Sequence, residues 1–174
     1  TNPAFKDFLE AGRPIGKLGL WRPGQGWTTL PIGSLSGPNG VALSADEQQV
    51  FVADWGGKGL ARLQLATGRI DRVDLGFRVD NVVWDTARRH LLAGGQHGSV
   101  AEVFACFESA TRVNCDTPFS VVAIDPATLR VTPLFGPGTA GVVGVGTGAL
   151  QDGDSLWLTS FRSDRLPRIA YPLR

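Results

Sequence analysis

A phrase that recurs along the chain constrains its fold more than any other feature. It occurs over residues 39–53, 81–93 and 146–159. Each copy has a polar or glycine start, an apolar run, a polar turn that carries Asp, and a second apolar run. Asn39 and Asn81 lie at the start of the first two copies, 42 residues apart, and a repeat of about 40–45 residues is the length of one propeller blade. Residues at the same place in successive blades face a common axis, so these positions can line a central site.

Short apolar runs between Gly, Pro and Asp turns predict an all-β chain built from hairpins. The 23 glycines and 11 prolines suit a chain with that many turns. One short amphipathic helix is expected over 3–12, with little helix after it. The expected strands are 40–44, 49–54, 59–65 and 69–75 in one complete blade, 81–85, 90–94, 119–124 and 129–134 in the next, 147–151, 155–160 and 166–173 in the last, and two short strands around the turn at 23–24 before the first blade.

Residues 1–174 are expected to form a single domain, a partial β-propeller of about three blades with an inserted cysteine-bearing loop at 96–118. Propellers usually close with about four to eight blades. We therefore expect a second copy, or sequence beyond this chain, to complete the ring, because an open edge strand would otherwise favour aggregation. The chain has no methionine and begins at Thr1, which favours a processed product or a fragment.

Charge and hydropathy argue against two classes of partner. The formal net charge is +1, and lysines and arginines are scattered, so no basic stripe indicates nucleic acid. No apolar run is long enough for a membrane span, and no leader with a basic start and an apolar middle is expected at the front. A small molecule is the expected partner.

Cys106 and Cys115 enclose an eight-residue segment and are the two cysteines of the chain. Their spacing favours a disulfide that closes this loop, and two free thiols in a cytosolic loop are the alternative. The sequence leaves the location open, and a periplasmic or secreted location is favoured if the two cysteines are bonded. A zinc site is not indicated, because neither histidine is spaced to join the cysteines.

Several stretches of the chain resemble one family of proteins. Residues 38–46, PNGVALSAD, followed by 50–54, VFVAD, resemble a signature of the SMP-30/gluconolactonase-like family. Residues 79–81, VDN, followed by 91–98, LLAGGQHG, are similar to a stretch of paraoxonase-type arylesterases. The stretch over 148–161 looks like the last blade of the same superfamily. The resemblance runs over most of the chain and corresponds to the second half of a six-bladed propeller.

This resemblance implies a calcium-dependent hydrolase of lactones or esters. In that family a divalent ion, usually calcium, lies in the central tunnel. Asn39 matches a ligand asparagine of the second half, Asp80 matches the ligand aspartate, and Asn81 matches the neighbouring asparagine that paraoxonase-like members add. The ligands of the first half, and the general-base histidines of paraoxonases, have no counterpart here. The isolated half is therefore expected to lack part of the site.

The same residues allow simpler interpretations. Asn39-Gly40 is also a common turn pair, and Asp80-Asn81 could cap the start of a strand. Carboxylate and amide oxygens suit calcium, although another divalent ion is an alternative, and one acid among neutral ligands binds weakly, so a second acid is expected. His97 follows an inner strand and is interpreted either as a tunnel-mouth residue that contacts substrate or moves a proton, or as a surface histidine.

Other polar and aromatic residues lie at strand ends. We expect Asp54 to cap a turn and His90 to be exposed between two strands. Residues 160–162, Ser-Phe-Arg, could face the tunnel mouth. Three tryptophans are expected to pack between blades: Trp55, Trp84 and Trp157.

The hypothesis from sequence is a calcium-dependent hydrolase of lactones or esters. Asp80 and His97 are its candidate catalytic residues, and Asn39, Asp80 and Asn81 are its candidate metal ligands. A non-catalytic propeller module that binds a ligand or a partner protein is the alternative, because one fold serves many functions. The sequence assigns neither the general base nor the natural substrate.

Overall fold

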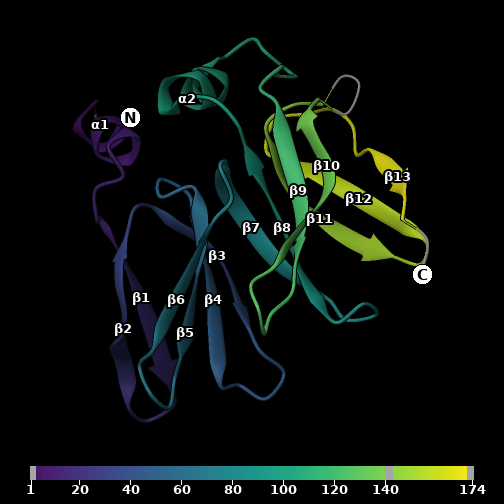
Figure 1. Ribbon diagram of the computed structural model, residues 1–174. Helices are drawn as coiled ribbons and strands as arrows, with labels where there is room; N and C mark the ends of the chain where they lie inside the picture. Colours follow the sequence, from purple (N-terminus) through teal and green to yellow (C-terminus); the bar gives the residue numbers. More distant parts are fainter. Residues whose placement is uncertain (1–2, 140–142, 172–174) are drawn as a thin grey trace.

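The computed structural model describes residues 3–139 and 143–171, which form antiparallel sheets and two short helices (Figure 1). The all-β expectation is confirmed. In chain order the elements are α1 (Pro3–Glu10), β1 (Gly16–Arg22), β2 (Gly26–Leu35), β3 (Pro38–Leu43), β4 (Gln49–Asp54), β5 (Gly59–Gln64), β6 (Ile70–Asp74), β7 (Arg78–Asp85), β8 (His90–Gln96), α2 (Val100–Glu108), β9 (Phe119–Ile124), β10 (Val131–Gly138), β11 (Gly146–Asp152), β12 (Ser155–Ser160) and β13 (Arg168–Ala170).

The sheets are meanders of consecutive strands. Their orders are β1-β2, β3-β4-β5-β6, β7-β8-β9-β10 and β11-β12-β13. The first strands of the last three sheets contact one another, β3 against β7 and β7 against β11. These strands are therefore the innermost of successive blades, as in a β-propeller, and the described chain holds two complete blades flanked by two partial ones.

Alternation along the second strand of each blade explains how the blades stack. In β4, Val50 and Val52 pack against the β1-β2 sheet, whereas Phe51 and Ala53 pack against the β7–β10 sheet. In β8, Leu92 packs with the β11–β13 sheet. Because both faces of these strands are covered, they appear in the sequence as nearly continuous apolar runs. Removing the fully buried side chain of Phe51 would cost about 3–5 kcal/mol.

The insertion at 96–118 contains a helix, α2, so the expectation of a loop there is wrong for residues 100–108. Ser99 and Glu102 form a capping box: each side chain accepts a hydrogen bond from the backbone N–H of the other residue. The buried residues of α2 recur every third residue on one face. Helix α1 lies within the range predicted for it. Neither helix in the described part of the chain is long and apolar enough to cross a membrane.

The inner strands begin earlier than the sequence predicted. β3 begins at Pro38 and β7 begins at Arg78, so Asn39 and Asp80 lie inside strands and not before them. The backbone N–H of Ser36 donates to Asp54 Oδ1 at 2.6 Å, which confirms the expected turn cap.

Two outer strands also differ from expectation. β10 begins at Val131 because Leu129 has a left-handed backbone, with φ of 59°, which extended strands do not contain. The third strand of the last sheet covers Arg168–Ala170 of the predicted 166–173, and residues 172 and 173 lie outside the described residues.

Candidate functional site

Each inner strand carries a β-bulge close to its start. In β7, Val79 pairs with Gly95 and Asn81 with Gly94, which leaves Asp80 as the extra residue. β11 has the same irregularity at Thr147, and β3 has it within Asn39–Gly40. Bulges re-aim a side chain and are common next to active sites. These bulges place Asn39, Asp80 and Thr147 at equivalent positions of three neighbouring strands, so that Asp80, and not Asn81 as the repeated phrase predicts, is the counterpart of Asn39.

The three inner strands approach one another closely at glycines. A Cβ atom at Gly40 would lie 2.6 Å from the backbone N of Val82 and 2.7 Å from Cα of Asn81, so only glycine fits between β3 and β7. A Cβ atom at Gly148 of β11 would lie 3.2 Å from Cβ of Asn81. The close approach of the three backbones at these glycines brings the bulged residues of the strands toward one axis.

A pocket of about 330 Å³ lies at this end of the axis. Its polar lining consists of Asn39, Asp80 and Gln96. Its apolar walls come from α1, from α2 and from segments that follow strands: Phe5, Leu9, Trp55, Val103, Phe104, Phe107 and Phe161. Figure 1 shows both helices at the end of the sheets where β3 and β7 begin. The structure therefore brings two of the three predicted metal ligands into one pocket, largely apolar in its walls.

Both carboxylate oxygens of Asp80 accept hydrogen bonds from amide groups. Gln96 Nε2 donates to Oδ2 at 2.9 Å, and Asn81 Nδ2 donates to Oδ1 at 3.0 Å. Burial raises the pKa of Asp80, and the hydrogen bond from Gln96 opposes that rise. Within residues 3–139 and 143–171 no lysine or arginine forms an ion pair with this carboxylate. Asn81 is exposed and does not line the pocket.

Gln96 is a central residue of the site that the sequence analysis did not select. Its side chain is fully buried at the end of β8. It donates to Asp80 and to the backbone oxygen of Gly146 at 2.7 Å, and it accepts from Trp55 Nε1 at 2.7 Å. Gln96 therefore joins three successive blades at the axis. The sequence carries one indication of this role: Gln96 ends a buried apolar strand, LLAGGQ, and a buried polar side chain needs hydrogen-bond partners.

Trp55 is buried as expected for packing, and it also forms part of the pocket wall. The guanidinium carbon of Arg78 lies 4.9 Å from the centre of its ring. Arg78 is itself buried, and burial lowers its pKa while the nearby Glu10 carboxylate raises it. Arg78 Nη2 donates to Glu10 Oε1 at 3.0 Å, and Glu10 Oε2 accepts from the N–H of Val100 at 2.5 Å. One carboxylate of α1 thus ties this helix to β7 and to the start of α2.

The structure does not bring His97 to the pocket beside Asp80. Its ring lies 5.6 Å from the ring of Phe77, and its Nε2 is 2.8 Å from Ser120 Oγ. Burial lowers the pKa of His97, so the ring is held neutral near neutral pH. Its role toward substrate stays a prediction. His90, expected to be exposed, is half-buried, with Nε2 3.4 Å from the buried carboxylate of Asp85.

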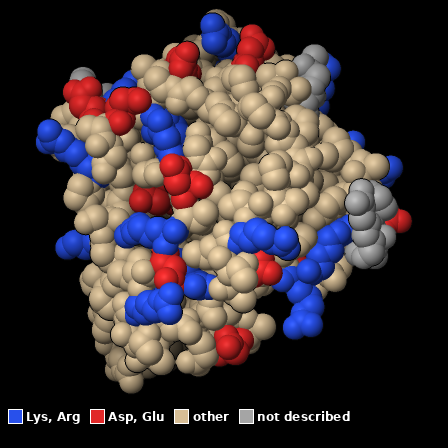
Figure 2. Space-filling view, in the orientation of Figure 1, with Lys and Arg blue, Asp and Glu red and all other residues tan. Residues whose placement is uncertain are grey.

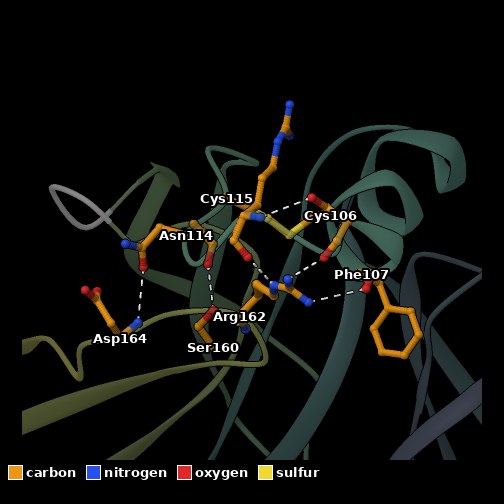
Figure 3. The surroundings of a disulfide bond; sticks show 10 residues. Cys106, Phe107, Asn114, Cys115, Ser160, Arg162 and Asp164 are labelled. Atoms are coloured by element: carbon orange, nitrogen blue, oxygen red, sulfur yellow. Dashed lines mark hydrogen bonds between the residues drawn. A yellow bond between two sulfur atoms is a disulfide. The ribbon is translucent and has the colours of Figure 1, made fainter.

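The predicted disulfide between Cys106 and Cys115 is present and closes the segment after α2. Figure 3 shows Arg162 beside it, with its guanidinium directed at backbone carbonyls of this segment. Arg162 donates to the carbonyl oxygens of Phe107, Ser109 and Arg112. Phe161, its neighbour in the chain, lines the pocket as predicted for the tunnel mouth, whereas Arg162 holds the disulfide segment in place.

Stacked antiparallel blades, with bulged inner strands that meet at a pocket, define this chain as part of a β-propeller. No family model and no curated protein sequence matches it. Among solved structures it is similar to a streptogramin B lyase, with a TM-score of 0.57 and 16% identity over 90% of this chain and 48% of that one.

A second similar structure is a catalytically inactive histidine variant of virginiamycin B lyase from Staphylococcus aureus, solved with quinupristin. Its TM-score is 0.54, with 14% identity over 95% of this chain and 51% of that one. These likenesses show the propeller fold. The chain spans about half the length of the two proteins.

Proposed function

We propose that this chain carries the calcium site of a propeller hydrolase that acts on lactones or esters, of the SMP-30/gluconolactonase or paraoxonase kind. The observation that carries the proposal is the meeting of Asn39 and Asp80 in one pocket, from equivalent bulges of neighbouring inner strands. The sequence resemblance selected both residues as ligands, and the pocket supplies space for a substrate beside them.

The donor chemistry of the site fits calcium. Asp80 offers a desolvated carboxylate that no lysine or arginine of the described residues neutralises, and a bound cation would offset that cost. Asn39 adds a hard amide oxygen, and Asn81 would add another if its side chain turned from Asp80. Calcium takes about six to eight oxygen ligands, so these residues make part of a coordination shell.

The residues of the chain would prepare the site for an acyl substrate. Gln96 and Asn81 hold both oxygens of Asp80, which fixes the orientation of a ligand side chain before anything binds. Calcium in this place would polarise an ester carbonyl and stabilise the oxyanion. The wall formed by Phe104, Phe107 and other aromatic side chains would pack against the apolar part of the substrate and exclude water.

A non-catalytic propeller module that binds a ligand is the second candidate. It is favoured by the position of the histidines, since neither His90 nor His97 lines the pocket. A hydrolase needs a proton acceptor within hydrogen-bond reach of the reacting atoms. On this second proposal the pocket binds a small molecule and turns nothing over.

The surroundings of the site bear on location and on the type of partner. Persistent disulfides belong to oxidising compartments, so the bond between Cys106 and Cys115 supports an extracytoplasmic location. On the face shown in Figure 2, basic and acidic side chains are interspersed and no basic stripe gathers. This distribution supports a small-molecule partner over nucleic acid.

Calcium titration by calorimetry tests the proposal, with the variant Asp80→Asn and the matched control Asp116→Asn. Asp116 is exposed and lies outside the pocket, so its change removes the same charge elsewhere. We expect binding by the wild type and by the control, and a loss of at least about 100-fold in affinity for Asp80→Asn. Equal binding by all three proteins, or by none, would contradict the calcium site. Calcium-dependent turnover of a lactone or aryl ester panel then separates the hydrolase from the binding module.

A further inference from the structure

Aromatic side chains from separate segments form one continuous wall along the pocket beside Asp80. The ring centre of Phe104 on α2 lies 6.1 Å from that of Trp55 and 6.4 Å from that of Phe107. The ring of Phe107 in turn lies 6.1 Å from the ring of Phe161, which follows β12. Neighbouring rings are inclined by 62–77°, the edge-to-face arrangement that aromatic pairs prefer. This aromatic wall therefore offers an occupant of the pocket both ring faces and ring edges.

Phe107 is the most exposed member of the aromatic wall, with 63% of its surface accessible. A single apolar side chain at a protein surface is ordinary, whereas a contiguous apolar patch marks a place where something binds. Phe107 does not stand alone, because Phe161 lies beside it, is itself 37% exposed and lines the same pocket. A ligand in the pocket would cover the ring of Phe107, and the gain in free energy would grow with the apolar area removed from water.

The backbone that carries Phe107 is held in place by the segment that follows it. Phe107 comes directly after Cys106, whose disulfide to Cys115 closes this segment. Its carbonyl oxygen accepts a hydrogen bond from Arg162, which also donates to two further carbonyl oxygens of the segment. Figure 3 shows the ring of Phe107 directed away from the disulfide, while its carbonyl oxygen is directed at Arg162. The ring is thus presented from a fixed backbone, which lowers the entropy cost of binding a ligand against it.

The polar side chains of the pocket gather at the propeller axis. Among the described residues that line the pocket, they are Asn39, Asp80 and Gln96. Both carboxylate oxygens of Asp80 accept hydrogen bonds, and the amide of Gln96 is bonded at its oxygen and at its nitrogen. A polyhydroxylated ligand would leave water for apolar walls, and burying hydroxyl groups without hydrogen-bond partners is costly. The pocket therefore disfavours a sugar-like ligand and favours one that is apolar away from the axis.

We propose that Phe107 is a specificity residue of this pocket and selects substrates whose non-reacting part is a flat apolar group. This inference deepens the function proposed above and rests on it for the reaction: the flat group lies against the aromatic wall while the ester or lactone carbonyl faces Asn39 and Asp80. The volume of about 330 Å³ is near the lower end of the about 300–1,000 Å³ of ligand pockets, which suits one such group. Phe107 lies outside the stretches that carry the family resemblance, so the resemblance does not assign it this role.

Calorimetric titration with two stable amides tests the selection. The probes are N-(2-naphthyl)acetamide, which carries a flat apolar group, and gluconamide, which carries a polyhydroxylated chain; neither is an ester, so binding is measured without turnover. We expect the wild type to bind the naphthyl probe at least about 100-fold more tightly than gluconamide. Phe107→Ala should weaken naphthyl binding at least about 10-fold, because it removes the exposed ring. Phe8→Ala is the matched control and should bind as the wild type does, since Phe8 is also an exposed helical ring but lies outside the pocket.

Phe107→Leu separates a flat group from a merely apolar one. It keeps an apolar side chain and removes the ring, so naphthyl binding should weaken by about 2–10-fold, the contribution of an aromatic pair beyond its buried area. Binding of N-octylacetamide, an alkyl probe, should stay at the wild-type value. An equal loss for both probes would overturn the preference for a flat group. Near-UV circular dichroism reports whether each variant is folded.

Two results would overturn the selection by Phe107. One is a wild type that binds the naphthyl probe no more tightly than gluconamide, and the other is naphthyl binding that is equal in Phe107→Ala and in the wild type. The calcium titration keeps these outcomes apart from the proposed function. Naphthyl binding that depends on Phe107, without calcium binding, keeps the selection and removes the calcium-dependent hydrolase. Calcium-dependent turnover of a sugar lactone, without naphthyl binding, keeps the hydrolase and removes the selection.

Discussion

Gln96→Leu is the substitution that tests most sharply how the blades are joined at the axis. It keeps the approximate volume and removes the three hydrogen bonds of a fully buried side chain. The N–H of Trp55 and the backbone oxygen of Gly146 then lose this partner at buried positions. An orphaned buried polar group costs about 1–3 kcal/mol, and two of them give an expected loss of about 2–6 kcal/mol in the free energy of unfolding.

The assay is urea unfolding followed by tryptophan fluorescence, with calcium removed. Gln64→Leu is the control, because Gln64 is half-buried on β5 and such a change usually alters stability by less than about 0.5 kcal/mol. A loss below about 1 kcal/mol for Gln96→Leu would refute the reasoning, since Gln96 would then not be joining the blades. Gln96→Glu adds a second test: it keeps the acceptor for Trp55 but sets a carboxylate against Asp80, so its instability should grow as the pH rises.

Three further predictions concern the groups around the pocket. Burial raises the pKa of Asp80 above its ordinary 3.8, so without metal the protein loses stability as the pH rises from below 3.8 through the pKa of the folded state. Asp80→Asn removes this buried charge and should therefore raise the melting temperature at about pH 7. An unchanged or lower melting temperature in calorimetric scans would contradict a destabilising Asp80 carboxylate. Glu10→Ala removes the carboxylate partner of the buried Arg78 and should cost about 1–3 kcal/mol in urea unfolding, less than for a fully buried pair because the Glu10 side chain is 48% exposed, whereas a loss under about 0.5 kcal/mol would mean that the ion pair does not hold α1. Replacing Cys106 and Cys115 by serine should cost about 2–3 kcal/mol and speed hydrogen exchange in residues 100–118 alone; a faster exchange throughout the blades would contradict this local role.

The local features of the fold were predictable from sequence because each depends on neighbouring residues. Alternation and turn residues predict the hairpins, and the repeated phrase predicts that Asn39 and Asn81 are equivalent, whereas the bulges of the structure make Asp80 the counterpart of Asn39. The short spacing of the cysteines indicated the disulfide. Helix α2 differs from the predicted loop although Ser99 and Glu102 carry its capping signal, because an insertion between two strands gives no strand pattern that separates a helix from a loop.

The remaining features depend on contacts between distant parts of the chain. Gln96 acquires its role only when Trp55 and Gly146 are brought to it from other blades. The position of His97 is set by Ser120 on the next strand, which no local pattern reveals. Arg162 likewise meets its carbonyl partners about 50 residues away along the sequence.

Terbium luminescence is the measurement that tests the metal site most directly. Terbium accepts the oxygen ligands that calcium uses, and Trp55 lines the same pocket as Asp80, so excitation of this tryptophan should sensitise a bound ion. We expect terbium emission that calcium displaces, that falls strongly in Trp55→Phe and that disappears in Asp80→Asn. Emission that is unchanged in Asp80→Asn, or no sensitised emission at millimolar terbium, would contradict a cation site at the propeller axis.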